Sequence, residues 1–404
     1  MLTVIKRKIQ TLRILWGRRH FFFANRYAKW IDDLHKNHSL FVPYTTNPYH
    51  RKDGDVKIFA YYLTQFHAIP ENDEAYGKGF TEWTNVATCS PQFVGHEQPK
   101  IPYDLGFYNL SMPGIMERQA QIASDYGVYG WCFYYYWFSG KKVLDKPLEY
   151  FLKSNIDIRF HLCWANENWS KLWDGGNKEV ILEQKYQEDD AYHFFNDILP
   201  YLNDNRYERI DNKPLLMIYR PQQMEKEYFR RFISILQSEA KRHGFEGLYI
   251  TESGLYEDNP QELGLQARTE FRPQGMWMSG KKIICDTLSK NVTTNIYDIS
   301  EYITTKKYIT NESFPVYKCC FPSWDNSPRK AYSEGYCFIM NAQLFKKWLI
   351  DSITWTKENH DLNHQYLYIN AWNEWAEGAI LEPTTRHGYE SLQMVKEAIE
   401  ETRK

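Results

Sequence analysis

Residues Tyr366–Trp372 (YLYINAW) form an apolar run that leads directly into the polar sequence of residues 373–378 (NEWAEG). The run does not alternate between apolar and polar positions, which is typical of a parallel strand buried on both faces. Carboxylates placed at the end of such a strand predict a functional loop at the carboxyl edge of a parallel sheet.

Seven similar runs precede this one and predict seven further strands. They are Lys57–Phe66, Val128–Tyr136, Ile158–Ala165, Pro214–Arg220, Gly247–Glu252, Ala267–Arg272 and Phe314–Phe321. Segments with spaced apolar residues lie between the runs and predict helices. These segments are Asp189–Asn203, Gln222–Arg242, Gln343–Glu358, Tyr389–Arg403, and one that begins at Ser111 and Pro113 and ends at Gly127.

Eight strands that alternate with helices are typical of a (β/α)8 TIM barrel, which is an α/β fold. A doubly wound sheet is the alternative, but the first strand is not followed by the Gly-x-Gly-x-x-Gly turn that binds a dinucleotide. No repeat or linker divides the chain. We therefore assign residues 56–404 to one catalytic barrel domain and residues 1–55 to an N-terminal helical extension.

The composition limits the partners and the compartment. The 404 residues carry a formal net charge of −2, so the protein as a whole has no electrostatic reason to bind nucleic acid. The seven cysteines have neither the spacing of a disulfide scaffold nor that of a zinc site, which predicts a reducing, cytoplasmic compartment.

The first 16 residues (MLTVIKRKIQTLRILW) are basic and amphipathic. Charges interrupt this segment before it reaches the apolar length of a signal peptide or a membrane span. Two interpretations remain open. The segment is either a helix docked on the domain or a peripheral contact with an anionic membrane surface, here the inner membrane.

In a barrel, functional side chains gather at the carboxyl ends of the strands. Polar and aromatic residues follow the predicted strands, and aromatic rings make flat platforms for the apolar faces of sugars. Each residue alone has a plainer interpretation as a packing ring, a turn residue or an ion pair, but their convergence on one rim predicts a saccharide site. The predicted substrate-binding residues are His67, Glu82, Trp83, Tyr135, Tyr136, Trp137, Trp164, Asn166, Glu167, Trp169, Arg220, Glu252, Glu270, Trp324, Asp325, Asn373 and Trp375.

Glu374 and Glu377 are the predicted catalytic residues. Cleavage of a glycosidic bond needs one carboxyl group as proton donor and a second as nucleophile or base. Burial and a neighbouring like charge both help a carboxyl group keep its proton near neutral pH. Trp372 and Trp375 flank Glu374, and a helical turn over residues 374–377 would place both carboxyl groups on one face.

Six stretches of the chain resemble the WbsX-like proteins, which are themselves similar to glycoside hydrolase family 99. The resemblance extends from about residue 57 to the C-terminus. The stretches are Tyr61–His67 (YYLTQFH), Gly79–Val86 (GFTEWTNV), Leu105–Tyr108 (LGFY), Cys163–Trp169 (CWANENW), Pro322–Arg329 (PSWDNSPR) and Trp372–Gly378 (WNEWAEG).

This resemblance implies a function in O-antigen or capsule pathways and an oligo- or polysaccharide substrate. Family 99 contains retaining endo-mannosidases that act without a covalent glycosyl-enzyme and use two glutamates of a matching Glu-x-x-Glu. By position, Glu374 would be the base that deprotonates the 2-hydroxyl group of the sugar. Glu377 would then be the acid/base at the glycosidic oxygen. The resemblance implies no metal and no cofactor.

Three other functions remain open. WbsX-like proteins are commonly described as glycosyltransferases, but the Asp-x-Asp of residues 53–55 precedes the first strand, at the wrong end of a barrel for a metal-dependent transfer site. A retaining enzyme can also pass a sugar to another saccharide, which would make the protein a transglycosylase. A non-catalytic glycan-binding protein would be expected to lack a carboxylate of the pair, whereas both are present.

Overall fold

The computed structural model describes residues 25–29, 40–171, 179–254, 259–276, 279–288, 292–310, 312–330 and 333–403. Eight parallel strands in this part of the chain form a closed barrel, in which β1 pairs with both β16 and β2. The strands are β1 (Lys57–Tyr62), β2 (Gly130–Phe138), β4 (Arg159–Trp164), β8 (Lys213–Ile218), β9 (Tyr249–Ser253), β10 (Ala267–Thr269), β13 (Val316–Cys320) and β16 (Tyr366–Ile369). All eight predicted strands are present, and the predicted (β/α)8 barrel is confirmed.

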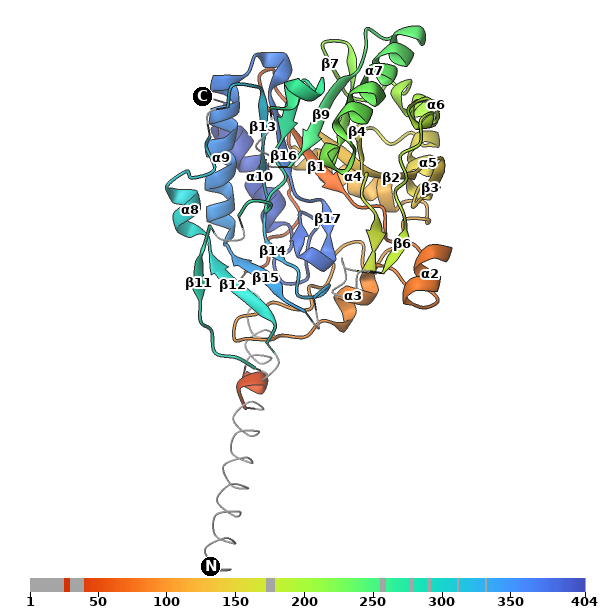
Figure 1. Ribbon diagram of the computed structural model, residues 1–404. Coiled ribbons are helices and arrows are strands. Elements are labelled where there is room, and N and C mark those ends of the chain that lie inside the picture. Colours follow the sequence, from red (N-terminus) through yellow and green to blue (C-terminus); the bar gives the residue numbers. More distant parts are fainter. Residues whose placement is uncertain are drawn as a thin grey trace, which may run out of the picture.

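Helices cover the outside of the barrel (Figure 1). All five predicted helical segments are helical in the structure. The helices are α2 (Pro70–Tyr76), α3 (Glu82–Thr88), α4 (Ile115–Asp125), α5 (Lys146–Lys153), α6 (Asp190–Leu202), α7 (Lys226–Arg242), α8 (Ser300–Thr304), α9 (Ala342–Asn359) and α10 (Glu390–Glu401). None of the helices in the described ranges is both long enough and apolar enough to span a membrane.

Side chains on each strand alternate between the barrel interior and the helix layer. Inside the barrel, Tyr61 of β1 stacks on Tyr134 of β2, with ring centroids 5.8 Å apart. Gly130 of β2 also faces inward, where a Cβ would lie 2.4 Å from the Phe59 ring, so glycine leaves room for that ring. Neighbouring positions such as Phe133 face outward and pack on the helices. This alternation decides which predicted residues can reach the catalytic end.

Smaller sheets are built onto the carboxyl end of the barrel. Residues between β10 and β16 form a four-stranded sheet in the order β11, β12, β15, β14, and two short hairpins follow β4 and β16. The bounds are β11 (Lys281–Ile283), β12 (Thr294–Asp298), β14 (Trp324–Asp325), β15 (Gly335–Ile339), β5 (Trp169–Ser170), β6 (Val180–Leu182), β17 (Asn373–Glu374) and β18 (Ala379–Ile380). Two further strands, β3 (Lys141–Val143) and β7 (Arg209–Ile210), pair antiparallel with β2 and β8.

The N-terminal extension differs from its prediction. Residues 25–29 are helical, but no α-helix is present in residues 41–55. The backbone of this later segment instead bonds to the barrel domain: the N–H of Val42 donates to the carbonyl of His387, and the N–H of Tyr49 donates to that of Asp125. The predicted helix over residues 41–55 is therefore corrected to an extended segment packed on the barrel. Residues 1–24 and 30–39 of the predicted extension lie outside the described residues.

Candidate active site

The chain turns sharply after β16 and brings two carboxylates to the carboxyl end of the barrel. β17 pairs antiparallel with β18, and the residues between them form a 3-10 turn, η6 (Trp375–Glu377). Gly378 ends this turn with φ of 63°, in the left-handed region. A Cβ at this position would lie 3.0 Å from the backbone nitrogen and oxygen of Asp325, so the close approach of the two backbones requires glycine.

Three carboxylates surround the guanidinium of Arg329. One Nη atom lies 2.6 Å from Glu377, and the other lies 3.1 Å from both Glu374 and Glu82. Arg329 and Glu82 are buried, whereas the side chain of Glu377 is 18% exposed. Arg329 follows β14 and Glu82 begins α3, so three separate loops converge on one cation. The predicted pair and the predicted Glu82 are therefore close neighbours.

This arrangement changes the acidity of Glu374. Burial raises its pKa to about 8; the Arg329 guanidinium opposes the shift, and the Glu377 and Glu82 carboxylates add to it. A carboxyl group with such a pKa gains and loses a proton near neutral pH, as acid/base catalysis requires.

A fourth glutamate, Glu382, holds the segment around Glu374 through its two neighbouring tryptophans. Its carboxylate is buried and accepts hydrogen bonds from the indole N–H groups of Trp375 at 2.6 Å and Trp372 at 3.1 Å. Gln119 and Tyr108 donate to the same carboxylate at 2.6 and 2.9 Å. Two of its partners therefore flank Glu374 in the chain, and Glu382 positions the segment without facing the three carboxylates.

Glu382→Gln is expected to lower kcat about tenfold with KM within about twofold. The amide of glutamine offers one acceptor oxygen to four donors and leaves buried donors unpaired, which costs about 1–3 kcal/mol. Loss of these bonds releases the indole rings that hold Glu374. Steady-state kinetics and urea unfolding measure both effects. Tyr108→Phe removes one of the four bonds and serves as the milder control; an equal kcat loss in the two variants would contradict the positioning role.

Aromatic side chains border the carboxylate cluster on the side of β2. Burial raises the pKa values of Tyr134 and Tyr136 well above the ordinary tyrosine value, and the nearby Glu374 carboxylate adds to both shifts. Trp169 of β5 packs on Tyr136 with ring centroids 5.6 Å apart and is only partly buried. These rings provide an apolar wall beside the carboxylates.

An ion pair lies on the side of β4 and β8. Arg220 contacts Glu167 at 2.7 Å, and burial raises the pKa of Glu167 although Arg220 opposes the shift. Burial raises the pKa of Tyr219, and both Glu167 and Glu377 add to that shift, so Tyr219 lies near both carboxylates. The predicted Glu167, Trp169 and Arg220 therefore belong to the same rim as Glu377.

Several predicted residues support this rim from beneath. The side-chain amide of Asn373 accepts a hydrogen bond from the N–H of Leu63 and donates one to its carbonyl. The side-chain amide of Asn166 makes the same two bonds with the backbone of Arg220. Trp83 and Trp375 pack together with ring centroids 5.4 Å apart. These side chains are buried and fix the loops to one another.

Asp325 also supports the site from beneath. Burial raises its pKa, but His96 at 2.7 Å, Gln98 at 2.7 Å and Ser327 lower the value overall to well below its ordinary range. The carboxylate is therefore committed to an internal network. The backbone of Asp325 packs against Gly378, the residue that ends η6.

Five predicted residues are not part of the site. Tyr135, Trp137 and Trp164 face outward and pack on α6, where Phe194 contacts all three rings. Glu252 lies 2.6 Å from Arg268 on the neighbouring strand, and Glu270 is buried at 3.0–3.1 Å from Arg272 and Lys318. Lys318 in turn lies over the Trp355 ring of α9, on the helix side of the barrel. The substrate-binding predictions for these five residues are corrected: Tyr135, Trp137, Trp164, Glu252 and Glu270 are packing or ion-pair residues outside the barrel.

His67 and Trp324 are buried at the carboxyl end of the barrel. His67 Nδ1 lies 3.0 Å from the carbonyl of Thr64, and burial lowers the pKa of His67 to about 4, so the ring is neutral at physiological pH. Trp324 belongs to β14, and its ring packs beside that of Phe321.

Sequence reasoning missed four residues of the site: Tyr134, Tyr219, Arg329 and Glu382. Tyr134 faces the same side of β2 as Tyr136, a period-two relation that was available in the sequence. Arg329 ends the stretch Pro322–Arg329, which carries part of the resemblance. Glu382 had no signal, because its partners come from distant segments.

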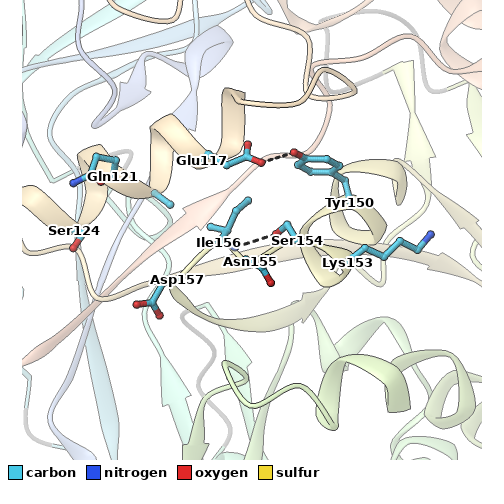
Figure 2. Close-up of a pocket in the computed structure, with 10 residues that line it drawn as sticks. Glu117, Gln121, Ser124, Tyr150, Lys153, Ser154, Asn155, Ile156 and Asp157 are labelled. Carbon is cyan, nitrogen blue, oxygen red and sulfur yellow. Dashed lines mark hydrogen bonds between the residues drawn. The ribbon is translucent and has the colours of Figure 1, made fainter.

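A cavity of about 640 Å³ lies elsewhere, between α4, α5 and residues 154–157 (Figure 2). Tyr150 donates a hydrogen bond to Glu117 across it, and most of its lining side chains are exposed. None of the predicted site residues lines this cavity. In the ranges that the structure describes, no group of three or more His, Cys, Asp or Glu side chains is arranged to hold a metal ion.

Comparison with known proteins identifies the family. Residues 58–395 match the family described as glycosyltransferase WbsX. The chain belongs to the WbsX family. The uncharacterized protein WxcX of Xanthomonas campestris pv. campestris strain B100 is 34% identical over 344 residues, which cover 85% of this chain and 49% of WxcX. WxcX of strain ATCC 33913 matches over the same shares. The chain thus spans about half the length of these curated relatives.

Solved structures share the fold of this WbsX-family chain. A glycoside hydrolase-like protein has a TM-score of 0.56 at 13% identity, covering 89% of this chain and 98% of its own. The GH99 endo-alpha-mannosidase of Bacteroides thetaiotaomicron, in complex with bis-tris-propane, has a TM-score of 0.54 at 11% identity, covering 86% and 98%. The predicted resemblance to the WbsX-like proteins and to the family 99 fold is therefore confirmed.

Proposed function

We propose that this chain is a carbohydrate-active enzyme that cleaves glycosidic bonds of a bacterial surface polysaccharide in an O-antigen or capsule pathway. The observation that carries the proposal is the cluster of Glu374 and Glu377 on Arg329 at the carboxyl end of the barrel. Arg329 holds both carboxyl groups at fixed positions, and the rings of Tyr136 and Trp169 provide a platform for a sugar beside them. The likeness of the fold to the GH99 endo-alpha-mannosidase supports an endo-acting, retaining mechanism.

In the proposed mechanism, Glu374 takes the proton of the 2-hydroxyl group while the oxygen of that hydroxyl group attacks the anomeric carbon. Glu377 gives a proton to the glycosidic oxygen as that bond breaks, which leaves a 1,2-anhydro sugar. In the second step, Glu377 takes a proton from water and the water oxygen bonds to the anomeric carbon. The bond between the anomeric carbon and the 2-oxygen breaks as Glu374 returns its proton to the 2-oxygen. Both glutamates are thus restored and the anomeric configuration is retained. Arg329 aligns the two carboxyl groups throughout.

The charges of the rim favour a glycosidic bond over a sugar nucleotide as substrate. Glu82, Glu374 and Glu377 surround Arg329, and Glu167 pairs with Arg220. A diphosphate placed here would lie among carboxylates, and like charges repel in a site of low dielectric constant. The family description as a glycosyltransferase supports transfer as the second candidate function, by passing a cleaved sugar to another saccharide.

The experiment that tests the proposal is incubation of the chain with surface polysaccharide, or with its lipid-linked repeat unit, in water enriched in oxygen-18. Hydrolysis yields shorter products in which the new reducing end carries the heavy oxygen, as mass spectrometry measures. Lengthened products that form without a sugar nucleotide establish transglycosylation. Lengthening that depends on an added sugar nucleotide contradicts the proposed mechanism.

The pH dependence tests whether the two glutamates act as one acid/base pair. The pKa of Glu374 is about 8, and the proposed mechanism needs one proton on the pair, which Glu377 gives to the glycosidic oxygen. We therefore expect kcat/KM to follow a bell-shaped profile that falls above about pH 8, where the free enzyme loses the last proton of the pair. Initial rates over about pH 5–10 measure the profile. A kcat/KM that stays level from about pH 7 to 10 would contradict an acid/base pair that shares one proton.

The cytoplasmic location and the peripheral contact with the inner membrane stay predictions.

A further inference from the structure

Three exposed apolar side chains gather around Asp286 in the segment that follows β11. Ile284 is 97% exposed, and Tyr27 and Val94 are each 44% exposed. The N–H of Val94 donates to the carbonyl of Asp286 at 2.8 Å, and Arg26, next to Tyr27, lies 3.0 Å from the Asp286 carboxylate. These two contacts bring three distant parts of the chain together at Asp286, and the exposed side chains that they carry, Tyr27, Val94 and Ile284, are here called the rim patch.

The rim patch lies at the catalytic end of the barrel. It belongs to the margin of the four-stranded sheet, and β14 of that sheet packs under the turn that carries Glu377 through Asp325 and Gly378. Figure 1 shows the segment after β11 beside helical residues 25–29, beyond the same end of the barrel as α3 and β17. A surface that binds the rim patch would face the end of the barrel where the carboxylates lie.

Basic residues lie close to the rim patch along the chain. Lys29 is exposed two residues after Tyr27, and Lys281 and Lys282 are exposed within three residues of Ile284. In the sequence, residues 1–24 contain no Asp or Glu. The lysines and arginines of this stretch are Lys6, Arg7, Lys8, Arg13, Arg18 and Arg19. Asp286, the acidic side chain at the centre of the patch, is neutralised by Arg26.

We propose that the rim patch docks the catalytic end onto an anionic lipid surface, with Ile284 inserted among the acyl chains. Apolar side chains beside basic residues are the combination that binds anionic membranes, by hydrophobic insertion and by attraction to the headgroups. A second copy of the chain fits less well, because a symmetric contact through this patch would bring two basic segments together. The docking does not depend on the proposed catalytic function.

Vesicle co-sedimentation of the full-length chain tests the docking. We expect binding to phosphatidylcholine vesicles that contain phosphatidylglycerol, and little binding to phosphatidylcholine alone. Ile284→Glu replaces the inserting side chain with a charge of the same sign as the lipid, and it is expected to lower the partition coefficient at least about tenfold. Leu362→Glu is the matched control: Leu362 is 61% exposed but lies in η5 (Leu362–His364), directly before β16 at the opposite end of the barrel.

The outcomes separate docking from its alternatives. Full binding by Ile284→Glu, or equal losses in the two variants, overturns the rim patch as the docking surface. Equal binding to neutral and anionic vesicles overturns the role of charge. A dimer in light scattering that Ile284→Glu dissociates assigns the patch to a second copy instead. Far-UV circular dichroism of each variant establishes that the fold is intact, and vesicle binding is measured without any saccharide.

Discussion

Glu377→Gln is expected to lower kcat of the proposed glycosidic cleavage by about three orders of magnitude, with little change in KM. A glutamine side chain neither gives nor takes a proton under these conditions, and loss of general acid/base catalysis costs about 10²–10⁴-fold in rate. Glutamine keeps the size of the side chain and an oxygen for the contact with Arg329, which lies 2.6 Å from Glu377 in the native protein. The loss should therefore be in catalysis, and steady-state kinetics separate kcat from KM.

Glu374→Gln is expected to give a similar loss, and the double variant little more than either single one, because two groups that act in one step are not additive. Glu167→Gln is the matched control. It removes a carboxylate on the same rim that pairs with Arg220 at 2.7 Å, and we expect less than about a tenfold loss. Activity of Glu377→Gln within tenfold of the native chain would remove Glu377 from the catalytic step.

The barrel itself was predictable from the sequence because its strands are buried on both faces. Runs such as Val128–Tyr136 and Tyr366–Trp372 are apolar throughout, and the segments between them have helical periodicity. The position of Glu374 and Glu377 followed from the same pattern, since they come directly after the last strand. The strand pattern and the place of the two glutamates after the last strand are both local properties of the chain, and for that reason one sequence was enough to predict them.

The orientation of side chains within the strands was not predictable in the same way. In a strand that is apolar on both faces, the sequence does not mark which positions point inward. Tyr134 and Tyr136 face the barrel interior, whereas Tyr135 and Trp137 contact the helices, and the four residues are alike in the sequence. The choice of Tyr135 and Trp137 as substrate-binding residues failed for this reason.

Contacts between residues far apart in the chain could also not be predicted from the sequence. Arg329 meets Glu82 and Glu374 only because three loops converge, at separations of 247 and 45 residues. Glu382 meets Gln119 across 263 residues. A charged residue in a loop has many possible partners, and the closed barrel selects among them.

The opposite end of the barrel contains another buried carboxylate, that of Glu208, with several cationic and hydroxyl partners. Its side chain is 1% exposed and lies 2.9 Å from the Lys57 ammonium and 3.1 Å from the Arg159 guanidinium. Tyr366 and Tyr129 donate to it at 2.6 and 3.2 Å. These partners stand at the amino ends of β1, β4, β16 and β2, so one carboxylate ties together half of the strands of the barrel.

Glu208→Ala is expected to lower the free energy of unfolding at neutral pH by about 1–3 kcal/mol, because it leaves the part-buried Lys57 and Arg159 side chains and two tyrosine hydroxyl groups without their acceptor. Urea unfolding measures the change.

Burial raises the pKa of Glu208, but Lys57, Tyr366 and Arg159 together hold it below its ordinary value. The stabilisation is therefore present above the ordinary glutamate pKa and is lost as the pH falls through the lower native value. The difference between native and variant protein should shrink on acidification, and a difference that is constant down to about pH 3 would contradict an ionic origin. Glu208 lies at the amino end of the barrel, remote from Glu377, so folded Glu208→Ala should keep the kcat of the native chain. Glu377→Gln should show the opposite result, with a native free energy of unfolding and a reduced kcat.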